Sequence, residues 1–168
     1  MANQKNYPVD VEGTDIMSSL LVNLLNTFPG LNNTERITFA TLGKLSGIGF
    51  FPASGAAILT ERKSITGHVK QTCSYPFVVV YRSNPRVESE KLKIKELLDA
   101  IGKWLSRQPI KIKGKVIQLA EYPQCENENR VISSIDFTQT AFMVSKYQDG
   151  TEDWEISCRV NYENEFDL

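Results

Sequence analysis

One stretch near the end of the chain limits the possible folds more than any other. Between residues 154 and 162 apolar and polar side chains alternate: Trp154, Ile156, Cys158, Val160 and Tyr162 point one way, and Glu155, Ser157, Arg159 and Asn161 the other. A period of two is typical of a β-strand with one buried face. Asp149-Gly150 just before it predicts a tight turn, so we expect this strand to fold back on the preceding segment as a hairpin.

A second alternating segment predicts another strand. Its apolar members share one face: Cys73, Tyr75, Phe77, Val79 and Tyr81. Pro76 falls on the other face, and because proline has no backbone N–H, we expect an edge position or a bulge there. Further strands are expected at residues 36–42, at 116–121 and over 131–147, the last as one bent strand or two.

Two segments have the apolar spacing of helices. The first is capped by Thr14, ends at Pro29-Gly30, and has the stripe Ile16, Met17, Leu20, Leu21, Leu24, Leu25 and Phe28. The second runs from about Glu88 to Ser106, has Asp99 and Lys103 as an expected pair on its polar side, and has the stripe Ile94, Leu97, Leu98, Ile101, Trp104 and Leu105. The order helix, β, helix, β-rich end predicts an α+β fold: an antiparallel sheet with two main helices packed on one side.

Length and composition bound the class of protein. At 168 residues we expect a polar N-terminal lead over residues 1–13 and a single domain over 14–168. The net charge of -1 argues against a general nucleic-acid binder. The longest apolar run, Phe77 to Tyr81, is too short to span a bilayer, and the N-terminus has no secretory pattern. Three cysteines without C-x-x-C spacing favour a reduced protein made inside a cell.

No residue pattern predicts catalysis. His68, the only histidine, has no nucleophile motif beside it, and Gly47-Ile48-Gly49 lacks the further glycine of a phosphate-binding loop. The acidic residues near Asp149 do not fall at the offsets of an EF-hand. We therefore expect no enzymatic activity, no cofactor and no metal ion.

Residues 43–57 combine loop-forming glycines with apolar side chains. Four glycines and Pro52 predict a loop, yet Ile48, Phe50 and Phe51 are apolar. Loops run over the surface, so these side chains are candidates for contact with a neighbouring molecule. The alternative is that both rings fold into the core of their own subunit.

Charge is segregated along the chain. Residues 82–115 carry a net charge of +6 and residues 116–168 a net charge of -8. These are either two solvated faces, or a positive patch that meets the negative patch of the next copy, a head-to-tail contact that can close into a ring. The candidate contacts are Lys111, Lys113 and Lys115 on one side of an extended segment, and Glu163, Glu165 and Asp167 near the C-terminus. The alternative is a frayed acidic end and a solvated basic strand.

The order of segments in the second half of the chain matches a known family. A β segment runs into Tyr75-Pro76-Phe77-Val78-Val79-Val80-Tyr81-Arg82, and a helix ends in Leu97-Leu98-Asp99-Ala100-Ile101-Gly102-Lys103-Trp104-Leu105. A β segment, Pro123, an acidic loop and an aromatic-rich strand from Phe142 to Tyr147 follow. Over roughly residues 65 to 162 this resembles the tail terminator and minor capsid proteins of long-tailed bacteriophages.

The resemblance implies a virion protein of the tail and neck region, assembled in the cytoplasm of the bacterial host and without enzymatic activity. Members of the family form a ring, commonly a hexamer, that terminates the tail tube and joins the tail to the head-side connector. The expected partners are further copies of the chain, the tail tube protein and the head-tail connector protein, with DNA passing through the lumen without sequence-specific binding and no membrane contact. Two alternatives stay open: a head-side connector or other neck or tail-completion protein of similar fold, and a small bacterial ligand-binding protein that uses the glycine-rich loop.

Overall fold

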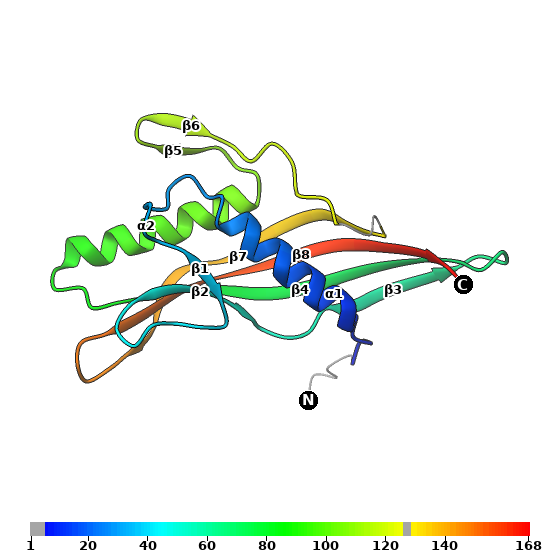
Figure 1. Ribbon diagram of the computed structural model, residues 1–168, viewed down its shortest axis with the longest axis horizontal. Coiled ribbons are helices and arrows are strands. Elements are labelled where there is room, and N and C mark those ends of the chain that lie inside the picture. Colours follow the sequence, from blue (N-terminus) through cyan, green and yellow to red (C-terminus); the bar gives the residue numbers. More distant parts are fainter. Residues whose placement is uncertain (1–5, 126–128) are drawn as a thin grey trace.

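The chain has an α+β fold built around one twisted, mostly antiparallel sheet (Figure 1). The computed structural model describes residues 6–125 and 129–168. In chain order they form α1 (Val11–Leu25), β1 (Ile37–Phe39), β2 (Gly47–Pro52), β3 (Ala57–Lys63), β4 (His68–Ser83), α2 (Glu88–Leu105), β5 (Ile110–Ile112), β6 (Lys115–Ile117), β7 (Arg130–Lys146) and β8 (Glu152–Asp167). The main sheet has the order β1-β2-β4-β8-β7, with β3 also paired to β4, and β5 and β6 form a separate hairpin.

The strands β4 and β8 form the centre of the sheet. They pair in antiparallel register from His68 opposite Asp167 to Ser83 opposite Glu152. β7 follows on the far side of β8 and is one bent strand, whose register shifts several times between Ile132 and Ser145. The hairpin predicted from Asp149-Gly150 is confirmed, and it joins β7 to β8.

The sequence predicted an edge position or a bulge at Pro76, but β4 is a central strand of the sheet and not an edge strand. On one side of β4, β2 pairs as far as Phe77 and β3 begins at Ser74. Pro76 lies in the gap between these two partners, where no neighbouring strand needs its missing N–H. The chain instead accommodates proline by changing the partner strand at that position.

Both helices pack on the same face of the sheet, as predicted. On α1, Ser18 Oγ lies 2.7 Å from the hydroxyl oxygen of Tyr75, a helix-facing residue of β4. On α2, Gly102 lies so close to the ring of Phe137 on β7 that a Cβ there would be 2.5 Å from ring carbons. Phe137 is opposite Cys158, whose side chain points to the same face. The predicted alternation of β8 is thereby confirmed, with its apolar positions turned to the helices.

The helix ends differ in detail from the prediction. α1 begins at Val11, within the expected polar lead, because Asp10 and not Thr14 is the N-cap, and Asp10 Oδ1 accepts the Gly13 N–H at 3.0 Å. Residues 1–5 of that lead lie outside the described residues. α2 covers Glu88–Leu105 as expected, but Asp99 pairs with Lys95 at 2.6 Å rather than with Lys103. The other carboxylate oxygen of Asp99 accepts the Ala141 N–H of β7 at 2.7 Å, which turns this residue towards the sheet.

One hydrophobic core lies between the helices and the sheet. It contains most of the predicted helix stripes together with Phe50, Tyr75, Phe77, Ile156 and Val160, while Ile16, Leu20 and Leu97 are partly buried and pack against it. The cysteines are buried free thiols, and burial raises the pKa of Cys73 to about 11 and of Cys158 to about 12. Both therefore act as small core residues, as the sequence predicted.

Two further expectations about strands are wrong. Residues 43–57 are not a continuous loop, because β2 occupies Gly47–Pro52 at their centre. The strand expected at 116–121 is reduced to β6, which ends at Ile117 and pairs only with β5. The acidic loop of the resemblance spans residues 125–129, of which 126–128 lie outside the described part of the chain. No helix in the described ranges is long and apolar enough to cross a membrane.

Candidate functional site

The adjacent rings of Phe50 and Phe51 lie on opposite faces of the sheet. Ile48 and Phe50 point to the helices and are buried, and Phe50 stacks on Phe77 with ring centroids 4.9 Å apart. The expectation that Ile48 and Phe50 contact a neighbouring molecule is therefore wrong, because a strand turns alternate side chains inward. Phe51 is half-buried on the other face, and its ring covers Gly49, where a Cβ would lie only 2.6 Å from Phe51 Cε2.

Phe51 belongs to an apolar patch on the sheet face opposite the helices, which we call the bare face. We define the bare face by six side chains that lie in two neighbouring rows of the sheet: Phe51, Val78, Val80, Phe142, Glu155 and Ser157. Neither α1 nor α2 covers these residues. Val80 is only 9% exposed, whereas Phe142 is 37% exposed. The patch thus resembles part of a core with one side missing.

Glu155 is the one ionisable residue of the bare face. It lies between Val80 on β4 and Phe142 on β7. Partial burial, with a smaller contribution from nearby Asp153, raises the pKa of the Glu155 carboxyl above its ordinary value. Among the described residues, no lysine, arginine or histidine lies within 4.0 Å of this carboxylate.

Arg82, the nearest arginine along the sheet, forms its ion pair with a different carboxylate. Arg82 forms a bidentate pair with Asp153, Nε to Oδ1 at 2.7 Å and Nη2 to Oδ2 at 2.8 Å. The Tyr147 hydroxyl donates to the same Oδ2 at 2.9 Å, and the Arg82 guanidinium lies 5.4 Å from the centre of the Tyr147 ring. The hydrogen bond from Arg82 is the main reason why the pKa of Asp153 lies below its usual value. Arg82 is therefore held in place, and Glu155 has no cation of its own.

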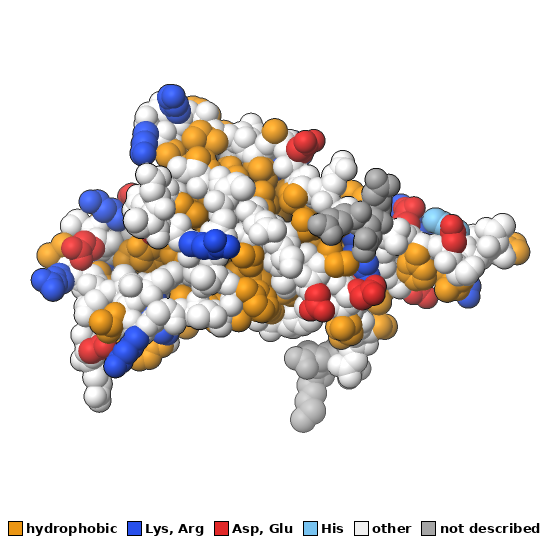
Figure 2. Space-filling view, in the orientation of Figure 1, with side chains coloured by type: hydrophobic (Ala, Val, Ile, Leu, Met, Phe, Trp, Pro, Cys, Tyr) orange, Lys and Arg blue, Asp and Glu red, His pale blue; other side chains and the backbone are white. Residues whose placement is uncertain are grey.

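The three candidate lysines lie on the β5–β6 hairpin and not on one extended segment. The chain reverses at Lys113-Gly114, both with positive φ (51° and 77°), which the alternation of lysines did not predict. Lys111 and Val116 are opposite each other on the outward side, and Val116 is 66% exposed. Figure 2 shows basic side chains at the outer end of this hairpin. Lys111, Lys113 and Lys115 are all exposed.

The acidic residues expected to meet these lysines have partners within their own subunit. Glu163 and Glu165 lie 3.4 Å and 3.3 Å from Lys70 Nζ, and Asp167 lies 2.8 Å from His68 Nδ1. The hydrogen bond to Asp167 is the main cause that raises the pKa of His68. The end of the chain is also not frayed, because β8 runs to Asp167. The structure therefore does not leave these three carboxylates as an unpaired acidic patch.

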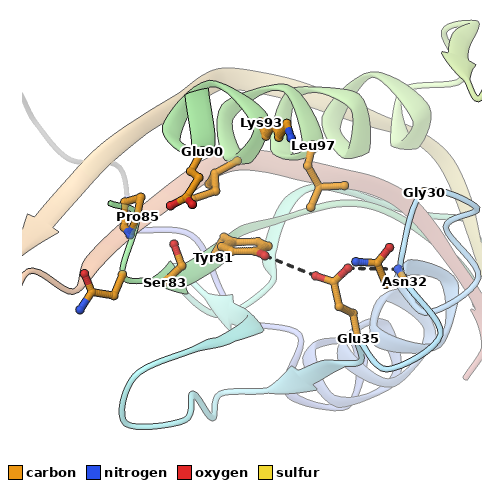
Figure 3. A pocket seen from close by; sticks show the side chains of 11 residues that line it. Gly30, Asn32, Glu35, Tyr81, Ser83, Pro85, Glu90, Lys93 and Leu97 are labelled. Carbon is orange, nitrogen blue, oxygen red and sulfur yellow. Dashed lines mark hydrogen bonds between the residues drawn. The ribbon is translucent and has the colours of Figure 1, made fainter. Parts of the chain in front are cut away.

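A groove of about 540 Å³ lies between α2, the end of β4 and the loop around residues 30–35 (Figure 3). The Tyr81 hydroxyl donates to Glu35 Oε2 at 3.4 Å, and the Asn32 N–H donates to Oε1 at 3.0 Å. Burial raises the pKa of the Tyr81 phenol, so it stays neutral. Ser83 Oγ is buried and has no partner among the described residues, so nothing pairs it with a base. The groove has room for a small polar group but shows no arrangement for catalysis.

A buried ion pair ties the start of α1 to the sheet. Arg130 donates to both oxygens of Asp10, at 2.8 and 3.1 Å, and the Tyr162 hydroxyl donates to Asp10 Oδ2 at 2.8 Å. Burial alone would raise the pKa of Asp10, but these hydrogen bonds and the one from Gly13 outweigh it and lower the pKa. This cluster is structural, since every oxygen of the carboxylate is occupied.

Sequence reasoning missed Glu155 and the groove. Glu155 was correctly placed on the polar side of β8, but its apolar surroundings come from β2, β4 and β7, whose register no local pattern reveals. Within the described residues, no group of three or more His, Cys, Asp or Glu side chains converges to hold a metal ion. The chain matches no protein-family model and has no match among the curated proteins searched.

Proposed function

We propose that this chain is a non-enzymatic structural protein of long-tailed bacteriophages. Copies of it form a ring, hexameric by analogy with the family that the sequence resembles, which terminates the tail tube and joins the tail to the head-side connector. DNA passes through the lumen of this ring. The proposed ring belongs to the tail and neck region of the virion and is assembled in the cytoplasm of the bacterial host.

The observation that carries the proposal is the presence of two chemically unlike surfaces on one subunit. The bare face is apolar with a single unpaired carboxylate, Glu155, and the β5–β6 hairpin is exposed and basic. Two different surfaces on one chain favour a head-to-tail contact, which generates a closed ring when the rotation allows. A net charge near zero also suits a lumen through which DNA must slide without being held.

The alternative of a head-side connector or another neck protein shares these features. The alternative of a ligand-binding protein rested on a glycine-rich loop, and the centre of that segment is the strand β2. A ligand-binding role could instead rest on a groove such as the one beside Tyr81.

Native mass spectrometry of the purified protein tests the ring. We expect a closed multiple of the 19.0 kDa subunit, with six copies as the leading expectation. A protein that stays monomeric at high concentration and binds a metabolite would contradict the proposal. Deletion of the gene in its phage then separates the two neck roles: overlong tail tubes support a terminator, and DNA-leaking heads with tails of normal length support a connector.

A further inference from the structure

The two surfaces that lack a partner within the subunit have matching chemistry. We propose that the β5–β6 hairpin of one copy docks on the bare face of the next copy, with Lys111 at Glu155 and Val116 at Phe142. This inference rests on the proposed ring and names the contact that would build it.

The hairpin is a rigid projection rather than a loose loop. Arg107 donates to the carbonyl oxygens of Leu119 and Ala120 at 3.2 and 2.6 Å, and Gln118 returns a hydrogen bond to the carbonyl oxygen of Arg107 at 2.7 Å. The Tyr122 hydroxyl donates to the carbonyl oxygen of Leu105, at the end of α2, at 2.8 Å. A braced hairpin loses little conformational entropy on docking, which favours a specific contact.

The two sides of the hairpin differ in what they contact. Ile110 is buried in the core, and Ile112 and Ile117 pack against that core. The outward side carries Lys111 opposite Val116, a positive charge beside an exposed apolar group. Among the described residues, no acidic side chain lies within 4.0 Å of the hairpin lysines.

The bare face presents the complementary pattern. Val80 and Phe142 flank Glu155, and among the described residues no cation lies within 4.0 Å of its partly desolvated carboxylate. A lysine delivered by an apolar hairpin would supply that cation while Val116 covers Phe142. Complementary charge within an apolar contact selects one register and one partner.

The contact has to be made between copies. The hairpin is anchored on the helix side of the sheet through Ile110, whereas the bare face is on the opposite side. One subunit therefore cannot place its own hairpin on its own bare face. The donor and acceptor surfaces differ, so each copy can donate to one neighbour and accept from another, as ring formation requires.

Cross-linking between engineered cysteines tests the pairing. The double variant Val116→Cys, Phe142→Cys, treated with a short bismaleimide, should give a ladder of covalent oligomers up to the size of the ring. The three natural cysteines are buried and should not react in the folded protein. The control is Val116→Cys with Val131→Cys, because Val131 is 60% exposed on the same strand but about 35 Å further along it.

Charge reversal gives the second measurement. Glu155→Lys should raise the concentration needed for assembly roughly tenfold or more, and Lys111→Glu in the same chain should restore much of the loss. Circular dichroism confirms that each variant is folded. The reversal Lys113→Glu serves as the matched control, since Lys113 lies at the turn and is not assigned to Glu155.

The outcomes separate the docking from the ring. Rings that form normally but give no ladder, or that give equal ladders with the Val131 control, overturn the docking and leave the proposed function standing. A wild-type protein that forms no oligomer at any concentration overturns the ring and this contact with it. A ladder specific to the Val116 and Phe142 pair, with rescue by Lys111→Glu, supports the inference.

Discussion

Two carboxylates of this chain show that burial and hydrogen bonding shift the pKa of a carboxyl group in opposite directions. Asp10 is buried, but Arg130, Tyr162 and Gly13 donate to it, so its charged form is favoured. Glu155 is less deeply buried, yet among the described residues no donor compensates for its loss of water, so its charged form is less favoured than it is in water. The hydrogen bonds to Asp10 stabilise the subunit. The Glu155 carboxylate has no such partner among the described residues, and another molecule can supply one.

Removing the arginine from the buried pair should be costly. Arg130→Met leaves Asp10 buried without its cation, and we expect the free energy of unfolding to fall by about 3–5 kcal/mol. Urea unfolding measures this. The control is Arg159→Met, which removes an exposed pair with Asp136 at 3.3 Å and should cost at most about 1 kcal/mol. Equal losses in the two variants would contradict the structural role of the cluster.

The Asp10 cluster also predicts a pH dependence. Because the pKa of Asp10 is lower in the folded chain than its ordinary 3.8, its stabilising contribution is present above about pH 4. It is lost as the pH falls through the lowered value. Arg130→Met should therefore lose less stability than the wild type between pH 4 and strongly acidic conditions, as followed by thermal unfolding.

Glu155 should behave in the opposite way. A raised pKa means that the folded subunit binds the proton more tightly, so ionisation destabilises it as the pH rises above the ordinary value of 4.5. Glu155→Gln should therefore raise the Tm of dilute monomer at neutral pH, and the gain should vanish in acid. The same variant should weaken the proposed assembly, because it removes the charge that we propose to meet Lys111. The exposed loop variant Glu121→Gln should change neither property.

At the scale of elements, a strand can be predicted from the sequence where apolar and polar side chains alternate. It cannot be recognised where glycines occupy the positions of one face. The pattern of β8 and the spacing of α2 were sufficient to predict both elements. In β2, Gly47 and Gly49 take the outward positions on either side of Ile48, so the segment looked like a loop. The Phe51 ring occupies the space that a side chain at position 49 would need, so glycine fits there. No local sequence pattern reveals this contact.

The surroundings of the candidate contact residues were hidden from the sequence for a related reason. The alternation of Lys111, Lys113 and Lys115 fits a strand and a short hairpin equally well until the positive φ at Lys113 is known. The acidic residues of β8 looked free because Lys70, which pairs with two of them, is more than ninety positions away in sequence. The register between neighbouring strands decides which charged side chains pair, and the amino-acid composition carries no information about that register.

Neighbouring phenylalanines should give opposite phenotypes. Phe50→Ala opens a cavity in the core and should cost about 3–5 kcal/mol of stability. Phe51→Ala should leave the subunit folded with a smaller loss and weaken oligomer formation. Thermal unfolding and native mass spectrometry, run on both variants, separate the two effects. Loss of folding in both would show that Phe51 belongs to the core after all.

The packing of α2 on the sheet depends on the absence of a side chain at one position. Gly102→Ala would place a methyl group about 2.5 Å from the Phe137 ring, which must move. We expect a net loss of stability, because overpacking costs about 1–3 kcal/mol and the better helix propensity of alanine returns about 1 kcal/mol. Lys103→Ala, next to it but exposed, should be close to neutral in urea unfolding. A more stable Gly102→Ala variant would contradict this close packing.

At the scale of the whole molecule, the segregated charges of the sequence lie on different parts of the fold. The basic stretch forms α2 and the hairpin, and much of the acidic stretch is neutralised within the sheet. Net charge by segment therefore overstated the acidic surface. The contact that we propose for assembly is therefore mixed: apolar in area and electrostatic in selectivity.

This balance predicts a moderate salt dependence of the ring. Raising the ionic strength from about 0.1 M to about 1 M shortens the screening length from about 10 Å to about 3 Å. Assembly should weaken severalfold and not disappear, because Phe51, Val78 and Phe142 still contribute apolar area. Analytical ultracentrifugation across this range provides the measurement. Complete dissociation in high salt would indicate a purely electrostatic contact.

The unbroken register between β4 and β8 gives the subunit a mechanical character. The two strands are 16 residues long and pair at every position, which is a beam of about 50 Å. A load applied along the strands is shared by all of these hydrogen-bonded rows in shear, whereas a load across them would open the rows one after another. A force on the projecting β3–β4 end therefore reaches the β7–β8 turn with little extension between them (Figure 1). The subunit should therefore resist tension along the strands and yield to a force applied across them.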